Sequence, residues 1–294
     1  MHHAPAVSDA ARALPAAELH WVVEESFADV ARMHKAVARV FPVALRRWRR
    51  SLWSPSVWSE ASRFRSALGE QPYDAVVDSQ GLLKSALVCA LARGTKHGLD
   101  RASAREPLAA RFYDVRHAVP KNLHAVERNR RLTAAALGYP YGGALEYGLH
   151  GKNPTPVSGV YGVFLTMTSR KDKLWPEERW IELGAELGIE VMLPWGSERE
   201  RERSERIARK IPRATVPSRM TVAEISGLFQ SARWVVGVDT GLTHLAAALG
   251  TRTVGVYCGS DPRLVGVYGA RAALNVGDAG RAPAVREVQK ALLQ

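Results

Sequence analysis

The sequence predicts an α/β protein in which parallel sheets carry helices on both faces, divided into two domains. Short apolar, β-branched runs alternate along the chain with helix-like segments, the pattern of strand–helix–strand units. Residues 139–155 interrupt this alternation with a stretch rich in Gly, Pro and Tyr that has little periodicity and is predicted as a linker. A chain of 294 residues is long enough for two domains of ordinary size.

The first block begins with a helix-like segment that has Pro5 near its start and a break at Pro15. A doubly wound domain usually begins with a buried central strand, so either this domain is built differently or the sequence begins late. The expected strands are residues 19–23, 40–45 and 73–78, and the expected helices are residues 27–37, 58–68, 79–91 and 124–137.

The second block alternates more regularly. Thr221 is a plausible N-terminal cap, and Gly250 is well placed to end a helix. The expected strands are residues 160–166, 189–193, 234–238 and 253–257, and the expected helices are residues 177–187, 198–210, 220–229, 241–249 and 282–294.

Asp239-Thr240-Gly241 joins a buried strand to a helix, and a second strand follows. Asp239 or Thr240 can cap this helix, and Gly241 lets a ligand approach the backbone. The free N–H groups and positive dipole end of such a helix favour an anion at the carboxyl end of the strand. Other strand ends in this block also carry polar groups, and together they suit a nucleotide diphosphate: Thr168, Ser169, Lys173, Gly196, Glu200 and His244.

Charge and composition narrow the function classes. The net charge is +12, and seven basic residues but no acid lie between Asp29 and Glu60, with Trp48 and Trp53 among them. This pattern suits a surface that touches an anionic, partly apolar partner. Nucleic acid also fits the charge, but no helix-turn-helix, zinc or RNA-binding signature accompanies it, so we expect no nucleic-acid partner.

No apolar run is long enough to span a membrane, no signal peptide precedes the first block, and the two cysteines lie in apolar surroundings. A cytoplasmic protein is therefore expected. The nine histidines lack metal-ligand spacing, so a metal-free site is expected, in which Lys, Arg and a helix dipole supply the positive charge.

Six motifs resemble the lipopolysaccharide heptosyltransferase I family of glycosyltransferase family 9, in order and nearly end to end. They are VDTGLTH at 238–244, LPWG at 193–196, WVVEE at 21–25, PVALRRW at 42–48, DSQGLLK at 78–84 and DPRLVG at 261–266. The resemblance implies a GT-B fold, with two Rossmann-like domains facing a cleft. It assigns residues 1–150 to the acceptor, residues 151–281 to the donor, and residues 282–294 to a helix that packs back toward the N-terminal domain.

The implied reaction is an inverting, metal-independent transfer of L-glycero-D-manno-heptose from ADP-heptose to the Kdo sugar of Kdo₂-lipid A, with no cofactor. It would occur at the cytoplasmic face of the inner membrane, where the protein binds peripherally. By resemblance, Lys173 stabilises the departing phosphates, and the donor site comprises Thr168, Ser169, Lys173, Glu200, Met220, Asp239, Thr240, Gly241 and His244. The acceptor candidates are Lys84, Arg105, His124, Arg128, Arg46, Arg47 and Arg49.

The beginning of the chain departs from the family pattern. Family members begin with a strand and a glycine-rich loop that ends in Gly-Asp, and that Asp is the presumed general base. Aligned over residues 2–9, this sequence starts about two residues after that Asp, which suggests that Met1 is an internal methionine of a longer protein. Poor stability and little transferase activity are expected of residues 1–294. The alternatives are a heptosyltransferase II-like or other GT-B transferase, and a non-catalytic binder of anionic lipid or nucleotide sugar.

Overall fold

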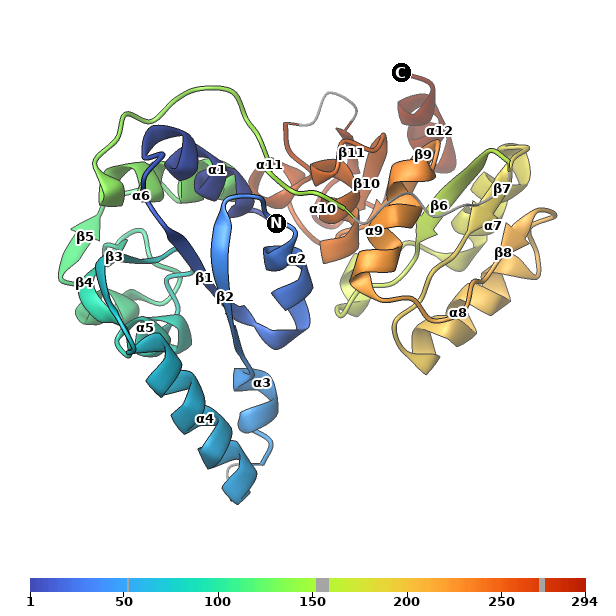
Figure 1. Ribbon diagram of the computed structural model, residues 1–294. Helices are drawn as coiled ribbons and strands as arrows, with labels where there is room; N and C mark the ends of the chain where they lie inside the picture. The colour runs from blue at the N-terminus through green and yellow to red at the C-terminus, as the bar shows by residue number, and fades with distance from the viewer. Residues whose placement is uncertain (52, 152–158, 270–272) are drawn as a thin grey trace. The chain divides into compact units, whose positions relative to one another are not determined.

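The computed structural model describes residues 1–51, 53–151, 159–269 and 273–294. It divides into two compact units, residues 2–148 and residues 149–294, with Met1 grouped with the second (Figure 1). The division falls beside the expected boundary at residue 150. Residues 152–155 of the expected linker lie outside the described residues. The predicted α/β fold with parallel sheets is confirmed in both units.

The C-terminal unit contains a six-stranded sheet in the order β11-β10-β9-β6-β7-β8, and every strand pair in it is parallel. The chain winds outward in one direction from β6 and in the other from β9, as in a doubly wound sheet. The strands are β6 (Tyr161–Leu165), β7 (Glu190–Met192), β8 (Ala214–Thr215), β9 (Trp234–Val238), β10 (Thr253–Tyr257) and β11 (Ala273–Gly277).

Every residue of β6, β9 and β10 is buried, as apolar strands covered on both faces should be. The core beneath them is rich in aromatic rings. Trp180 packs against Phe164 with ring centroids 4.8 Å apart and edge-on against Trp175 at 4.9 Å. This packing fixes the sheet whose strand ends carry the candidate site.

The connecting segments of this unit are α7 (Glu177–Glu186), α8 (Glu198–Ala208), α9 (Val222–Ser231), α10 (Gly241–Ala248), α11 (Pro262–Val265), α12 (Val285–Leu293) and the short turn η3 (Lys171–Lys173). Thr221 caps α9 as predicted, because its hydroxyl accepts a hydrogen bond from the Glu224 N–H and the Glu224 carboxylate accepts one from the Thr221 N–H. Gly250 follows α10 with φ +84°, a conformation that favours glycine.

The apolar face of α12, which includes Val285, Val288 and Leu292, is buried in the core of the C-terminal unit. The Trp175 indole N–H also donates to the Pro283 carbonyl at 2.9 Å, just before the helix begins. The helix is therefore part of the C-terminal unit, and the expectation that residues 282–294 pack back toward the N-terminal domain stays a prediction.

The N-terminal unit contains two parallel sheets, β1-β2 and β3-β4-β5. Its strands are β1 (Leu19–Glu24), β2 (Val37–Val43), β3 (Pro72–Asp78), β4 (Arg93–Leu99) and β5 (Val115–His117). Its helical segments are α1 (Ala4–Ala13), η1 (Glu25–Phe27), α2 (Ala28–Arg32), α3 (Leu45–Trp48), α4 (Pro55–Leu68), α5 (Leu83–Cys89), η2 (Pro107–Phe112) and α6 (Ala125–Leu137). Gly138 follows α6 with φ +74°, a conformation that favours glycine.

Helices α1 and α6 are held together by a buried ion pair. The Arg130 guanidinium donates from Nε to Asp9 Oδ2 at 2.6 Å, and it also donates to the carbonyls of Gly142 and Gly143 at 3.1 Å. Both side chains are almost fully buried, so the pair is stable only because every strong donor finds an acceptor.

Several elements of the N-terminal unit differ from the prediction. The helix expected within residues 27–37 is present as α2, and it ends at Arg32 because buried His34 accepts a hydrogen bond from the Ala36 N–H and β2 begins at Val37. The helix expected at residues 79–91 begins only at Leu83, since the Asp78 carboxylate accepts from the Gln80 N–H and forms a turn. Strands β4, β5, β8 and β11 were not predicted.

Candidate functional site

The donor candidates meet at the switch point of the C-terminal sheet. Strands β6 and β9 are neighbours there, and the chain leaves them in opposite directions along the sheet. Ligands of open α/β sheets bind in the crevice outside such a point. The loop after β6 carries Thr168 and Lys173, and the loop after β9 carries Asp239. The fold therefore brings together side chains that lie more than 60 residues apart in the sequence.

Asp239 is the centre of this cluster. Its Oδ2 atom accepts a hydrogen bond from Lys173 Nζ at 2.6 Å and another from the Ser260 hydroxyl at 2.6 Å. Its Oδ1 atom lies 3.4 Å from His244 Nε2, and its backbone carbonyl accepts from the Thr168 hydroxyl at 3.0 Å. A carboxylate and a lysine are thus held in fixed positions at the edge of the sheet.

The electrostatics keep Asp239 ionised. Burial raises the pKa of this carboxyl, but the hydrogen bonds from His244, Lys173 and Ser260, together with the charge of Lys173, outweigh burial and hold the pKa well below its usual range. At neutral pH the site therefore contains a carboxylate and a lysine cation side by side. Asp239 is suited to accept hydrogen bonds from sugar hydroxyls, and Lys173 is suited to attract phosphate.

Helix α10 begins at this cluster. Thr240 precedes the helix and makes no side-chain capping hydrogen bond, contrary to the expectation that Asp239 or Thr240 would cap it. The Asp239 side chain instead bonds Lys173 and Ser260. A Cβ atom added to Gly241 would meet nothing within 4 Å, so the space beside the first residue of the helix is open. This end of α10 suits an anion, because the backbone N–H groups of the first turn can donate hydrogen bonds and the positive end of the helix dipole lies here.

The remaining donor candidates lie in the same unit but outside the hydrogen-bonded cluster. Ser169 is exposed on the loop after β6. Glu200 lies in the first turn of α8, and its carboxylate accepts from the Gly196 N–H at 2.7 Å. Met220 is half-buried just before the cap of α9. The structure shows no direct contact of these three side chains with Asp239.

Ser260 is a member of the cluster that the sequence analysis did not select. It follows β10, the neighbour of β9, in the stretch 258–262. A Cβ atom on Gly259 would lie 2.6 Å from the Asp172 carbonyl oxygen, which shows how closely this loop approaches the turn that carries Lys173. The signal that could have found Ser260 is its position at the carboxyl end of the next strand.

Four acceptor candidates surround one end of the β3-β4 sheet. Lys84 lies in the first turn of α5 and is exposed. The loop carrying Arg105 is tied to that turn, because the Leu83 N–H donates to the Glu106 carboxylate at 2.7 Å. Burial lowers the pKa of Arg128, and the charge of Arg105 nearby lowers it further. These positive groups are therefore close to one another.

His124 and Arg128 already have structural roles. Buried His124 caps α6 by accepting a hydrogen bond from the Val126 N–H, and Arg128 donates to the Ser103 carbonyl at 2.7 Å. A capping histidine fixes the beginning of the helix on which Arg128 lies one turn later. The structure thus shows what positions this part of the basic cluster.

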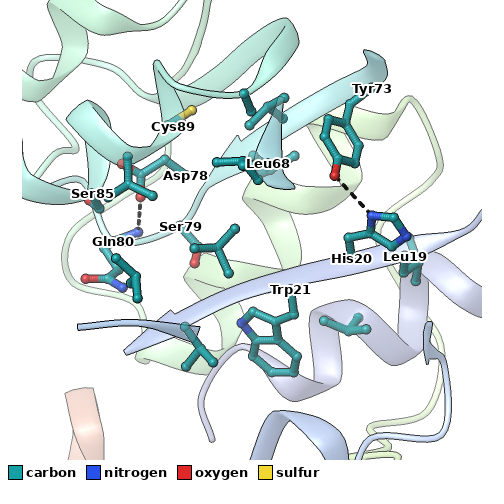
Figure 2. Close-up of a pocket in the computed structure, with 18 of the residues that line it drawn as sticks. Leu19, His20, Trp21, Leu68, Tyr73, Asp78, Ser79, Gln80, Ser85 and Cys89 are labelled. Atoms are coloured by element: carbon teal, nitrogen blue, oxygen red, sulfur yellow. Dashed lines mark hydrogen bonds between the residues drawn. The ribbon is translucent and has the colours of Figure 1, made fainter. Parts of the chain in front are cut away.

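The arginines in and after α3 differ in their partners. Arg47 donates to the carboxylates of Glu25 and Glu60, and these hydrogen bonds raise its pKa. Its charge is therefore offset by two acids. Arg46 and Arg49 are exposed, and Arg46 lies with Lys84 on the lining of a cavity of about 390 Å³ in this unit (Figure 2). Of the three arginines, Arg46 and Arg49 remain the better acceptor candidates.

The described residues contain neither a candidate metal site nor a helix suited to span a membrane. No cluster of three or more His, Cys, Asp or Glu side chains among them could hold a metal ion. None of the helices in the described ranges combines the length and apolar character that crossing a membrane requires.

Comparison with known sequences identifies close relatives. The model of the family "Glycosyltransferase family 9 (heptosyltransferase)" matches residues 61–293. Lipopolysaccharide heptosyltransferase 1 of Escherichia coli K12 is 46% identical over 277 residues, which cover 92% of this chain and 87% of that protein. The protein of the same name from Pseudomonas aeruginosa PAO1 is also 46% identical and covers 92% of this chain and 78% of its own length.

Solved structures agree with this relationship. The E. coli heptosyltransferase WaaC with ADP superposes with a TM-score of 0.90 at 42% identity, covering 98% of this chain and 93% of that one. The same enzyme with ADP-2-deoxy-2-fluoro heptose gives 0.87 at 41% identity, over 98% and 93% of the two chains. E. coli heptosyltransferase II, at 19% identity, shares the fold. With the family model over most of its length and relatives at 46% identity, this chain belongs to glycosyltransferase family 9, the heptosyltransferases.

Proposed function

We propose that the protein transfers L-glycero-D-manno-heptose from ADP-heptose to the Kdo sugar of Kdo₂-lipid A, with inversion and without a metal ion. The observation that carries this proposal is the cluster of Asp239, Lys173 and Ser260 beside the beginning of α10. Such a cluster offers a cation, helix amides and a carboxylate to a nucleotide diphosphate sugar. The E. coli relative, which has ADP or an ADP-heptose analogue in its structures, supports the choice of donor.

The chemistry of the donor half follows from the charges. The acceptor hydroxyl attacks the anomeric carbon of the heptose from the face opposite the diphosphate, and the proton of that hydroxyl passes to water. The bond between the anomeric carbon and the phosphate oxygen breaks, and its electron pair departs with ADP. Lys173 and the first amides of α10 stabilise the negative charge that develops on the diphosphate, the role that a metal ion has in other transferases. Asp239 accepts hydrogen bonds from sugar hydroxyls.

The acceptor half is proposed to be the basic group formed by Lys84, Arg105 and Arg128, with Arg46 nearby. The charge of Arg105 already lowers the pKa of Arg128, so the two cations repel each other in the absence of an anion. Phosphates and Kdo carboxylates would relieve this repulsion. His124 takes part by fixing the first turn of α6.

Contact with the membrane is proposed for the surface formed by Arg49, Arg50 and Trp53 after α3 and by Trp58 in the first turn of α4. Trp53 is 97% exposed and Trp58 is 65% exposed, which is unusual for tryptophan. Arg49 and Arg50 are exposed beside them. Exposed indoles next to arginines suit the interface of an anionic lipid bilayer, where Trp side chains are favoured. This surface would place the protein on the cytoplasmic face of the membrane that holds its acceptor.

The decisive experiment is a transfer assay with two acceptors. Purified protein is incubated with ADP-heptose and either Kdo₂-lipid A or the same lipid that already carries one heptose, and the products are measured by mass spectrometry. Heptose added only to the first acceptor supports the proposal, and addition only to the second supports a heptosyltransferase II activity. Calorimetry with ADP-heptose and with UDP- and GDP-sugars tests the donor separately. Binding without transfer to either acceptor would support a nucleotide-sugar binder and agree with the little transferase activity expected of residues 1–294, and it would overturn the proposed reaction for this chain.

A separate vesicle experiment tests the membrane surface. Trp53→Ser/Trp58→Ser should reduce co-sedimentation with anionic phosphatidylglycerol vesicles and leave ADP affinity unchanged. Equal sedimentation of the variant and the parent would refute this surface, without bearing on the donor site.

A further inference from the structure

Two donors share one oxygen of the Asp239 carboxylate. Lys173 Nζ and the Ser260 hydroxyl each donate to Oδ2 at 2.6 Å, whereas Oδ1 lies 3.4 Å from His244 Nε2. The two donors on Oδ2 differ in charge, because the ammonium group is a cation and the hydroxyl is neutral. A diphosphate at the beginning of α10 therefore competes with the carboxylate for only one of the two, the lysine.

The loop that carries Ser260 is fixed by its neighbours. The Cys258 carbonyl accepts a hydrogen bond from the Gly280 N–H at 2.8 Å. Gly259 lies so close to the turn η3 that an added Cβ atom would be 2.6 Å from the Asp172 carbonyl oxygen. These contacts hold the backbone just before Ser260, and the short serine side chain adds little reach of its own. The hydroxyl is therefore presented to the carboxylate by a fixed loop.

Lys173 is the donor that can move. It lies in the single turn η3, and its ammonium group is at the end of a flexible four-carbon stem. Its side chain is 18% exposed, against 10% for the Asp239 side chain, so the lysine extends further toward solvent. The ammonium group can turn from the carboxylate to a phosphate without a change in the backbone, a movement that Ser260 cannot make.

The departure of the lysine changes what Asp239 requires. The carboxylate is mostly buried, and a buried anion is costly unless it accepts hydrogen bonds. Without its cation it would also repel the diphosphate that attracted the lysine. The Ser260 hydroxyl reduces both costs, because it remains on Oδ2 and disperses part of the negative charge.

We propose that Ser260 is a positioning residue, whose hydrogen bond retains Asp239 while Lys173 moves from Oδ2 to the diphosphate of the donor. This inference rests on the donor site proposed above. Oδ2 has two donors in the free protein and one in the ADP complex, so the hydroxyl contributes more to the complex than to the free protein. Ser260 thus raises donor affinity through Asp239 and Lys173, and it needs no contact with the nucleotide.

A double-mutant cycle tests this role by isothermal titration calorimetry with ADP. Ser260→Ala should weaken ADP binding by about 5- to 20-fold, because it removes the last donor from Oδ2 in the complex. Ser260→Thr keeps the hydroxyl and should stay within about twofold of the parent. In the Lys173→Met background, Ser260→Ala should change ADP affinity by less than about twofold, since Oδ2 then has the same donors with and without ADP.

Ser231→Ala is the matched control. It removes a hydroxyl of the same unit that donates to the Gly227 carbonyl within α9, and it should bind ADP like the parent. An equal loss of affinity from Ser260→Ala with and without Lys173 would show a merely structural role and overturn the proposal. So would equal losses in Ser260→Ala and Ser260→Thr.

The same titrations separate this role from the donor site itself. If the parent binds ADP and Ser260→Ala binds it as tightly, only the role of Ser260 is refuted. If the parent does not bind ADP, the donor site is refuted together with it.

Discussion

Replacing Lys173 with methionine tests the donor site most directly. The change removes the ammonium group, keeps most of the side-chain volume, and leaves Asp239 without the partner that now lies 2.6 Å away. A hydrogen bond to a charged group contributes about 1.5–3 kcal/mol, so loss of the lysine contact should weaken ADP binding by about 10- to 150-fold. Without the lysine cation, the Asp239 carboxylate also repels the diphosphate. This repulsion favours the upper half of the 10- to 150-fold range.

Isothermal titration calorimetry with ADP measures this effect, and Lys171→Met is the matched control. Lys171 belongs to the same short turn and is exposed, so its replacement changes the net charge equally. We expect the ADP affinity of Lys171→Met to stay within about twofold of the parent, because the Lys171 charge is exposed and is screened by water and salt. Lys173→Met/Asp239→Asn should recover part of the loss by removing the repelling carboxylate. The reasoning is refuted if Lys173→Met binds ADP as tightly as the parent, or if both lysine variants lose affinity equally.

Three further predictions concern stability. Asp9→Ala should lower the stability of the N-terminal unit by about 3–5 kcal/mol in thermal unfolding, because the buried Arg130 guanidinium loses its closest carboxylate and keeps only the longer carboxylate contact, with Glu127. Asp29→Ala, at an exposed pair, should change the stability by less than about 1 kcal/mol. Gly162→Ala should destabilise the C-terminal unit by about 1–3 kcal/mol in urea unfolding, since the added Cβ would lie 2.1 Å from a buried indole; an unchanged midpoint would contradict this. Burial lowers the pKa of the stacked His97 and His117 rings, so below about pH 6.5 the unfolded chain binds more protons than the folded one. The stability of the protein should therefore fall as the pH is lowered below that value. Unfolding midpoints measured from about pH 7.5 to 5 should depend less on pH in His117→Gln than in the parent.

The best-predicted parts of the fold have their signal within one continuous segment. Strand β9 was predicted with its observed bounds, because five apolar residues end at Asp239 and a helix with a glycine after it follows. By contrast, β4 has the sequence RGTKHGL, with only one large apolar residue, and it is a strand because β3 and β5 pair with it on both sides. A tertiary cause of this kind leaves no local pattern in the sequence.

In the candidate site, too, the features with a local sequence signal were predicted and those that depend on tertiary structure were not. Lys173 and Asp239 were selected because each follows a predicted strand, but their direct contact depends on β6 and β9 being neighbours, which strand order alone determines. Ser260 was missed although it occupies the equivalent position after β10. The cavity that β1 and β3 line was not predicted, because it depends on how the two sheets are placed and not on a pattern within either strand.

The pairing of Lys173 with Asp239 has a consequence for turnover. A diphosphate that reaches this lysine competes with an internal anion for the same ammonium group, so part of the attraction is offset before binding begins. The same competition helps the spent nucleotide to leave, because Asp239 can take the lysine back as ADP departs. The carboxylate thus acts as a counter-ion that limits product retention, and Asp239→Asn should hold ADP longer than the parent while transferring heptose more slowly.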